Sequence, residues 1–158
     1  MEIARLEDGA FSVTGLEEPL VDFLKAIIPS CDPGEHPGAH DRLYPSPQPH
    51  GATAEAAGED WREYVQPELE HLFASAAAIV KGDLKDLRVG GVLTIPAQHV
   101  DAWLNTLNQA RLVLAARFDI TEEAMERPIS TILSNEHEIA LFQIHFYGFI
   151  QECLIRGE

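Results

Sequence analysis

Hydrophobic residues recur at helical spacing over residues 96–118, and this stretch predicts one long helix. Its apolar stripe comprises Val100, Trp103, Leu104, Leu107, Leu114 and Phe118. Arg111 falls on the centre line of that stripe, where a dry face is expected. A buried guanidinium without partners costs several kcal/mol, so a neighbouring element has to supply hydrogen-bond acceptors to Arg111.

A second long helix is predicted over residues 135–155. Ser134 and Asn135 provide its cap, and Glu138 completes a capping box. One apolar face of this helix comprises Ile139, Phe142, Phe146, Phe149, Ile150 and Cys153, and a second comprises Leu141, Ile144, Gly148 and Ile155. A helix that is hydrophobic on both sides belongs at the centre of a fold or in a subunit interface. We therefore expect a homodimer through the second face or through Trp61.

Shorter patterns predict a small antiparallel sheet. Alternating runs at residues 3–6 and 11–13 flank Asp8 and Gly9, which form a strong two-residue hairpin signal. Residues 88–95 predict a turn and a short strand that pairs with this hairpin.

Two further helices are predicted between these elements. The first begins with a capping box from Thr14 to Glu17 and ends before Pro29. The second begins at Glu59, and Pro67 kinks or splits it because proline lacks a backbone donor and clashes with the preceding turn.

Residues 30–58 are rich in proline, glycine and histidine, and we expect an irregular excursion there. The excursion gathers side chains able to ligate a metal, namely Cys31, Asp32, Glu35, His36, His40 and Asp41. Two histidines four residues apart ligate zinc reliably only when a helix holds both rings on one face. Since the prolines and glycines argue against a helix, we expect a solvated loop and no metal site.

The combined pattern predicts a mainly α fold. A chain of 158 residues, 46% of them hydrophobic, matches a single domain that buries its own core. We expect one helical domain over residues 1–158, of about four to six helices, with a small N-terminal antiparallel β-sheet.

The chain is strongly acidic, with 26 Asp and Glu against 11 Lys and Arg and a formal net charge of -15. This charge repels phosphate backbones and anionic lipid headgroups, so we expect neither nucleic acid nor a membrane as a partner. Cys31 and Cys153 show no CxxC spacing, and the N-terminal residues show no signal-like apolar run. We expect reduced thiols in a cytoplasmic protein.

Asn108, Arg111 and Gln143 form the candidate site. Asn108 lies one turn before Arg111, and Gln143 lies inside an apolar face of the last predicted helix. These side chains form either a buried polar network that fixes the packing of two helices or an anion pocket. In the second case the guanidinium presents a planar fork to a carboxylate or phosphate. A pocket of roughly 300 Å³ or more beside Arg111 favours the anion pocket, and a sealed network favours the structural interpretation.

Motifs of catalysis do not occur in this sequence. There is no G-x-S-x-G elbow, and Gly90-Gly91 lacks the lysine and the helix start that follow a phosphate-binding loop. Paired glutamates lie at predicted helix N-termini, where the helix dipole accounts for them. We expect no catalytic residue and no cofactor.

One segment of the predicted central helix resembles a known family. Trp103-Leu104-x-x-Leu107-Asn108-x-x-Arg111-Leu112-x-Leu114-x-x-Arg117 is similar to the most recognisable stretch of an uncharacterised bacterial family, the domain-of-unknown-function family numbered two thousand and seventeen. Similar pieces in the same order are Arg42-Leu43-x-Pro45 and Gly148-x-x-Gln151-Glu152-x-Leu154. The family has no established activity, so the resemblance implies no catalytic residue. Its members are mainly actinobacterial and often lie beside the gene for the Clp protease adaptor, which implies a link to Clp-type proteolysis.

We therefore expect a non-enzymatic interaction or regulatory protein that binds other proteins and forms a homodimer. The alternative is a small-molecule anion-binding protein or enzyme that uses Arg111 and Asn108.

Overall fold

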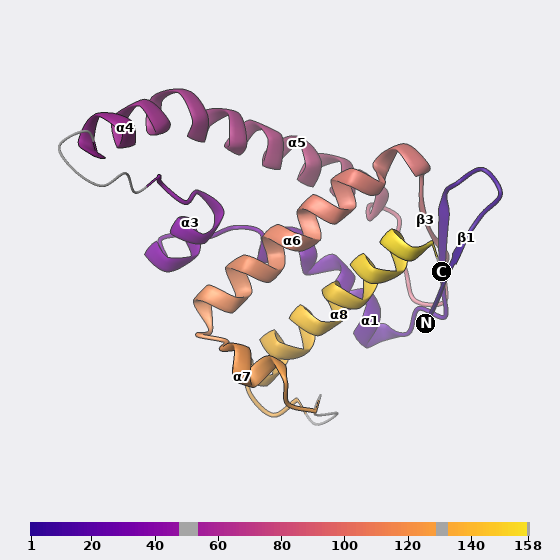
Figure 1. The fold of residues 1–158 in the computed structure, drawn as a ribbon. Coiled ribbons are helices and arrows are strands. Elements are labelled where there is room, and N and C mark those ends of the chain that lie inside the picture. The colour runs from indigo at the N-terminus through magenta and orange to yellow at the C-terminus, as the bar shows by residue number, and fades with distance from the viewer. Residues whose placement is uncertain (48–53, 129–132, 158) are drawn as a thin grey trace.

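The computed structural model describes residues 1–47, 54–128 and 133–157. Two long helices, α6 (Val100–Arg117) and α8 (Glu136–Arg156), lie side by side at the centre of the fold (Figure 1). Helix α6 also contacts α2, α3 and α5, so it is the element around which the others pack. Trp103 of α6 and Tyr147 of α8 are fully buried in this core. The fold is mainly α with a small antiparallel sheet, as the sequence predicts.

The sheet has three strands in the order β1 (Glu2–Arg5), β2 (Phe11–Thr14) and β3 (Leu93–Ile95). Both pairings are antiparallel: β1 and β2 form the predicted hairpin, and β3 joins β2 from the other side. Gly9 has a φ of 84°, a left-handed conformation that suits glycine in this tight turn. Phe11 and Val13 of β2 are buried against the helices, so the sheet closes one end of the core.

The first helical region is split into α1 (Glu18–Lys25) and α2 (Ile27–Ser30). The predicted capping box is wrong, because Thr14 is the last residue of β2 and Glu17 caps α1 without a side-chain hydrogen bond. Pro29 lies within α2 and does not end the helical region at the expected point.

Helix α3 (Pro37–Leu43) lies inside the segment predicted to be irregular. Pro37 occupies the first turn, where its missing N–H costs nothing, and the Nδ1 atom of His36 accepts a hydrogen bond of 3.2 Å from the backbone N–H of Ala39. Ala39 and Leu43 pack in a small apolar cluster with Val113 of α6. The expectation of an irregular excursion over residues 30–58 is therefore wrong for this part, and it is also wrong for residues 54–58, which are helical; residues 48–53 lie outside the described residues.

Three continuous helical elements form an arm that extends along one side of the molecule (Figure 1). They are α4 (Ala54–Asp60), the π-helical turn η1 (Trp61–Val65) and α5 (Gln66–Asp83). Pro67 falls in the first turn of α5, as the sequence allows, but the helical run is not split there: a π-helical turn directly before α5 accommodates the proline.

The last part of the chain begins with a 3-10 turn, η2 (Ala97–His99), that leads into α6. After α6 comes the short helix α7 (Glu122–Met125). The predicted cap of α8 is confirmed: the Oδ1 atom of Asn135 accepts from the Glu138 N–H at 2.9 Å, and Glu138 accepts in return from the Ser134 N–H at 2.8 Å. None of the helices in the described ranges has the length and apolar run that crossing a bilayer requires.

Candidate functional site

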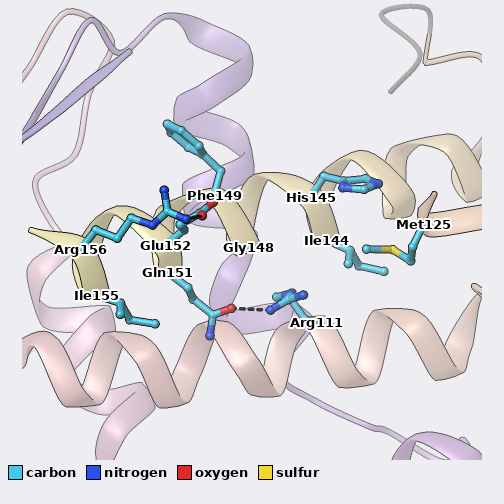
Figure 2. A pocket seen from close by; sticks show the side chains of 10 residues that line it. All are labelled: Arg111, Met125, Ile144, His145, Gly148, Phe149, Gln151, Glu152, Ile155 and Arg156. Carbon is cyan, nitrogen blue, oxygen red and sulfur yellow. Dashed lines mark hydrogen bonds and ion pairs between the residues drawn. The ribbon is translucent and has the colours of Figure 1, made fainter. Parts of the chain in front are cut away.

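Arg111 lies on the side of α6 that faces α8, and it is half-buried there. Gly148 of α8 is opposite the guanidinium (Figure 2). A Cβ atom at position 148 would lie 3.5 Å from Cζ of Arg111 and 3.6 Å from both Nε and Nη2. A side chain at position 148 would therefore stack on the face of the guanidinium near Nε and Nη2, and glycine leaves that face without one.

Within the described ranges, the guanidinium has one hydrogen bond to another side chain. Its Nη1 atom donates to Oε1 of Gln151 at 2.6 Å, and Nε2 of Gln151 donates to the carbonyl oxygen of Leu104 at 3.0 Å. The Nε atom of Arg111 is buried and has no hydrogen-bond partner among the described residues. Burial lowers the pKa of Arg111 below its ordinary value, because the charged form loses part of its hydration.

The positive charge of Arg111 is not neutralised within the described part of the chain, where no carboxylate forms an ion pair with it. Glu152 is nearby on α8 but pairs with Arg156 at 2.6 Å. That pair is well exposed to solvent, so it contributes little to stability. Arg111 is thus a partly dehydrated cation whose side-chain partner is a neutral amide.

A hollow of about 740 Å³ opens beside Arg111 between α6, α7 and α8 (Figure 2). Its walls are lined by Arg111, Met125, Ile144, His145, Gly148, Phe149, Gln151, Glu152, Ile155 and Arg156. The Nε2 atom of His145 is a second buried polar atom without a partner among the described residues. Two lining residues therefore carry unsatisfied polar atoms, next to apolar wall residues such as Ile144.

The structure does not bring the three predicted site residues together. Asn108 is exposed on α6, and no hydrogen bond within the described ranges joins it to Arg111. Gln143 is buried, but its Nε2 atom donates to the Tyr147 hydroxyl at 3.2 Å, and that hydroxyl donates to the Phe23 carbonyl at 2.9 Å. Gln143 therefore belongs to the contact of α8 with α1, and Gln151, which the sequence analysis missed as a partner, holds Arg111.

The predicted interface residues do not share one uncovered face. Ile144 is only 3% exposed and belongs to the core, whereas Ile155 is 72% exposed. Leu141 and Gly148 are half-buried. Three of the four, with Leu141 the exception, line the hollow beside Arg111.

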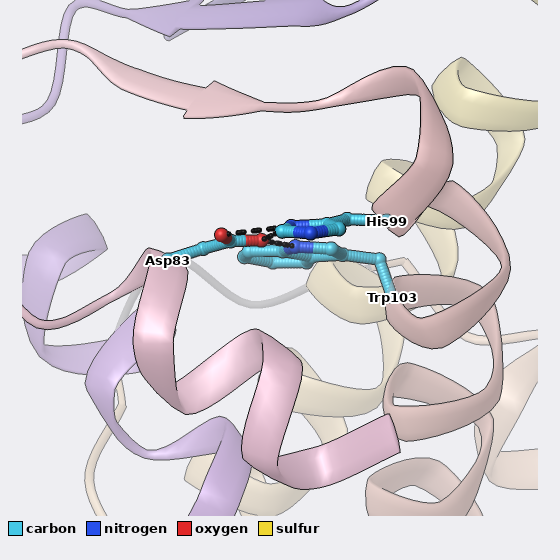
Figure 3. A network of polar contacts seen from close by, with 3 residues as sticks. All are labelled: Asp83, His99 and Trp103. Atoms are coloured by element: carbon cyan, nitrogen blue, oxygen red, sulfur yellow. Dashed lines mark hydrogen bonds and ion pairs between the residues drawn. The ribbon is translucent and has the colours of Figure 1, made fainter. Parts of the chain in front are cut away.

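A second polar cluster was not predicted. Nε1 of Trp103 donates to Oδ2 of Asp83 at 2.9 Å, and Nδ1 of His99 lies 3.0 Å from both carboxylate oxygens (Figure 3). The cluster joins the end of α5 to the start of α6. The available signal was Trp103 itself, because a buried indole N–H requires an acceptor.

The possible metal ligands of residues 31–41 do not assemble. Nδ1 of His36 is engaged by the cap of α3, and the described residues contain no group of three or more metal-ligating side chains. The Sγ atom of Cys31 lies 3.3 Å from the carbonyl oxygens of both Ile27 and Thr106, which share its single S–H donor. Burial raises the pKa of this thiol to about 12, so it is a poor nucleophile.

Comparison with known proteins gives one match. A family model described as "Domain of unknown function (DUF2017)" matches residues 4–157. No curated protein and no solved structure matches the chain. The resemblance drawn from the sequence is confirmed over nearly the whole chain.

Proposed function

Because the chain belongs to the DUF2017 family, whose description assigns no activity, we propose from the site geometry that it is a binding protein for a small anion. The ligand carries carboxylate or phosphate oxygens and binds in the hollow beside Arg111. The buried, unpartnered Nε atom of Arg111 is the observation that carries this proposal.

An arginine side chain binds oxyanions through two parallel N–H groups. In Arg111, Gln151 accepts from Nη1, and Nε is the buried donor without a partner among the described residues, so we assign the Nε–Nη2 pair to the ligand. Gly148 lies over the guanidinium face beside this edge, and no side chain extends from it into the hollow. A bidentate oxyanion here satisfies the buried Nε and neutralises the cation.

The size of the hollow also supports ligand binding. Its volume of about 740 Å³ exceeds the roughly 300 Å³ expected as the lower limit for small-molecule sites. Met125, Ile144 and Ile155 provide apolar contact for the body of an organic acid. A sealed polar network, the structural alternative, has no such opening.

Titration with inorganic phosphate and with succinate, followed by isothermal calorimetry, tests the proposal. We expect saturable binding to the wild type and a loss of at least about tenfold in affinity in Arg111→Met, since charged hydrogen bonds contribute about 1.5–3 kcal/mol. Arg117→Met is the matched control, because Arg117 is exposed at the end of the same helix. Equal affinity in both variants, or no binding of either anion to the wild type, would refute the proposal.

A variant that blocks the hollow but keeps the Arg111 charge tests whether the anion needs access to the hollow. Gly148→Leu retains Arg111 but places a bulky side chain in the hollow, over the guanidinium face near Nε and Nη2, so we expect it to abolish anion binding. Gly148→Ala places its Cβ at ordinary contact distance and serves as the control that folds normally. Undiminished binding in Gly148→Leu would place the ligand elsewhere.

We propose protein interaction as a second candidate function, on the evidence of the arm. Tyr64, Val65 and Leu72 are 66%, 42% and 54% exposed on η1 and α5. Monomeric proteins expose single apolar residues, but an apolar row along one helix marks an interaction surface. Loss of a copurifying protein partner in Leu72→Glu supports this candidate, and an unchanged set of partners contradicts it.

We also propose the homodimer of a cytoplasmic protein, with Ile155 as the exposed part of the predicted α8 face. Light scattering at high micromolar protein concentration gives the molar mass and so distinguishes a dimer from a monomer. A dimer mass that Ile155→Glu converts to a monomer mass supports the proposal. A monomer mass for the wild type refutes it.

A further inference from the structure

The three lysines of the chain all line one hollow. Lys25, Lys81 and Lys85 are far apart in sequence, yet they surround a concavity of about 760 Å³ where α1 and α2 meet the end of α5. The chain has 26 acidic residues, but none of those that the structure describes lines this hollow. The hollow is therefore a cationic region on a strongly acidic molecule.

The floor of the hollow is apolar. Ile28, Pro29, Ala78 and Leu84 contribute to its lining. Gly82 also lines the hollow, and a Cβ atom at this position would meet no heavy atom within 4 Å. The hollow is thus open above Gly82.

Helix capping accounts for only part of this arrangement. Lys25 and Lys81 lie in the last turns of α1 and α5, where the helix dipole favours a cation. The dipole does not explain why two helices bring these ends to one apolar hollow, or why Lys85, beyond the end of α5, lines it too. Lysines that extend their methylene groups along an apolar surface present their ammonium groups at its rim.

We propose that this hollow binds a small amphipathic anion, with an apolar chain on the floor and a carboxylate or phosphate head among the three ammonium groups. The volume lies within the range of about 300–1,000 Å³ that small-molecule sites occupy. The ligand binds as a free molecule and not within a bilayer, because the net charge of -15 opposes contact with an anionic membrane. This site shares no residue with the Arg111 hollow and does not depend on it.

NMR titration of the ¹⁵N-labelled protein with octanoate, 1-octanol and acetate tests both parts of the proposal. Octanoate is expected to shift the backbone amides of Ile28 and Gly82 at lower concentration than either of the other probes, because only octanoate combines an apolar chain with an anionic head. Equal responses to octanoate and octanol would show that the lysines recognise nothing, and equal responses to octanoate and acetate would show that the floor contributes nothing. Either result overturns the proposal. Binding to vesicles containing one-third phosphatidylglycerol, without binding of free octanoate, also overturns it.

Two variants locate the site. Replacing the lysines in K25Q/K81Q/K85Q is expected to weaken octanoate binding at least about fivefold, since exposed charge pairs contribute modestly each. The control R5Q/R42Q/R117Q removes three exposed cations outside the hollow and gives the same net charge. Gly82→Leu fills the floor in a helix where leucine is favoured over glycine, and the control Ala74→Leu introduces a leucine on an exposed part of α5 outside the hollow.

The expected pattern is loss of octanoate binding in the lysine triple variant and in Gly82→Leu, with binding retained in both controls and in Arg111→Met. Equal affinity of the lysine and arginine triple variants would overturn the proposal, as would undiminished binding in Gly82→Leu. Failure of phosphate to bind at Arg111 leaves this pattern unaffected, so the two sites are tested separately.

Discussion

Gln151 holds Arg111 at one end of the guanidinium only. Its Oε1 atom accepts from Nη1 at 2.6 Å while its amide group is fixed by the Leu104 carbonyl at 3.0 Å, so the side chain has a defined orientation. A neutral amide in this place orients the cation without neutralising it. A carboxylate in the same place would form an ion pair and remove the attraction for an external anion.

Gln151→Glu is therefore expected to lower the affinity for phosphate at least about tenfold, because it supplies the negative charge that the ligand would provide. Gln98→Glu is the matched control, since Gln98 is exposed in η2 and the change in net charge is the same. Calorimetric titration measures the phosphate affinity of both variants. Equal phosphate affinity in the two variants would contradict the role assigned to Arg111.

The Asp83 carboxylate is expected to stabilise the junction of α5 and α6. Asp83→Ala leaves the buried Trp103 N–H without its acceptor and should lower the free energy of unfolding by about 1–3 kcal/mol. Asp83→Asn retains an acceptor oxygen and should cost less. Urea unfolding monitored by tryptophan fluorescence gives the values, with the exposed Asp86→Ala as control. Equal free energies of unfolding for Asp83→Ala and Asp86→Ala would show that the Asp83 carboxylate does not stabilise the junction.

Replacement by alanine is expected to affect stability differently at two asparagines. Asn135→Ala removes the cap of α8 and should cost about 1 kcal/mol in the free energy of unfolding. Asn108→Ala replaces an exposed residue within α6 by a better helix former, so stability should be unchanged or slightly raised. Thermal unfolding of both variants gives the comparison. A cost for Asn108→Ala as large as that for Asn135→Ala would restore the buried role that the sequence predicted for Asn108.

Stability is expected to fall above pH 9. Burial raises the pKa of Cys31 from 9.0 to about 12 and that of Tyr147 from 10.0 to about 12, so the unfolded chain loses these protons at lower pH than the folded protein. The stabilisation is complete below pH 9 and decreases as the pH rises toward 12, by about 1.4 kcal/mol per pH unit for each group that titrates.

Urea unfolding at a series of pH values between 8 and 10.5 measures this slope. In a plot of the free energy of unfolding against pH, Cys31→Ala should reduce the slope that begins near pH 9. Tyr147→Phe should reduce the slope above pH 10. A wild-type stability that is constant over this range would show that neither group is protected by the fold.

Periodicity predicted the long helices, the three strands and the cap of α8, because each rests on local spacing and on side chains within one turn of each other. Local rules failed where a neighbouring element decides the outcome. Thr14 carries a capping pattern, but pairing in β2 takes this residue into the sheet. Pro37 and Gly38 argue against a helix by local rules, whereas proline in the first turn and packing of Leu43 against α6 support one.

The candidate site was predicted in part. The position of Arg111 on an apolar stripe identified the cation, because burial of a charge is unusual at any helical position. Its partner was assigned to Gln143, and the structure places Gln151 there. Both glutamines lie on α8, and only the rotation of that helix against α6 and α1 decides which of them faces Arg111. Sequence periodicity does not fix that rotation when a helix is hydrophobic on both sides.

The most direct test observes the Arg111 side chain itself. In a ¹⁵N spectrum that resolves arginine Nε–Hε groups at low temperature, with Arg111→Met used to assign the signal, phosphate or succinate is added to the wild type. We predict a saturable downfield shift of the Arg111 Nε–Hε signal, because the buried donor gains an acceptor, while the exposed Arg117 signal stays in place. An Arg111 signal that does not move with millimolar anion, or that moves no more than that of Arg117, would contradict an anion site at this residue.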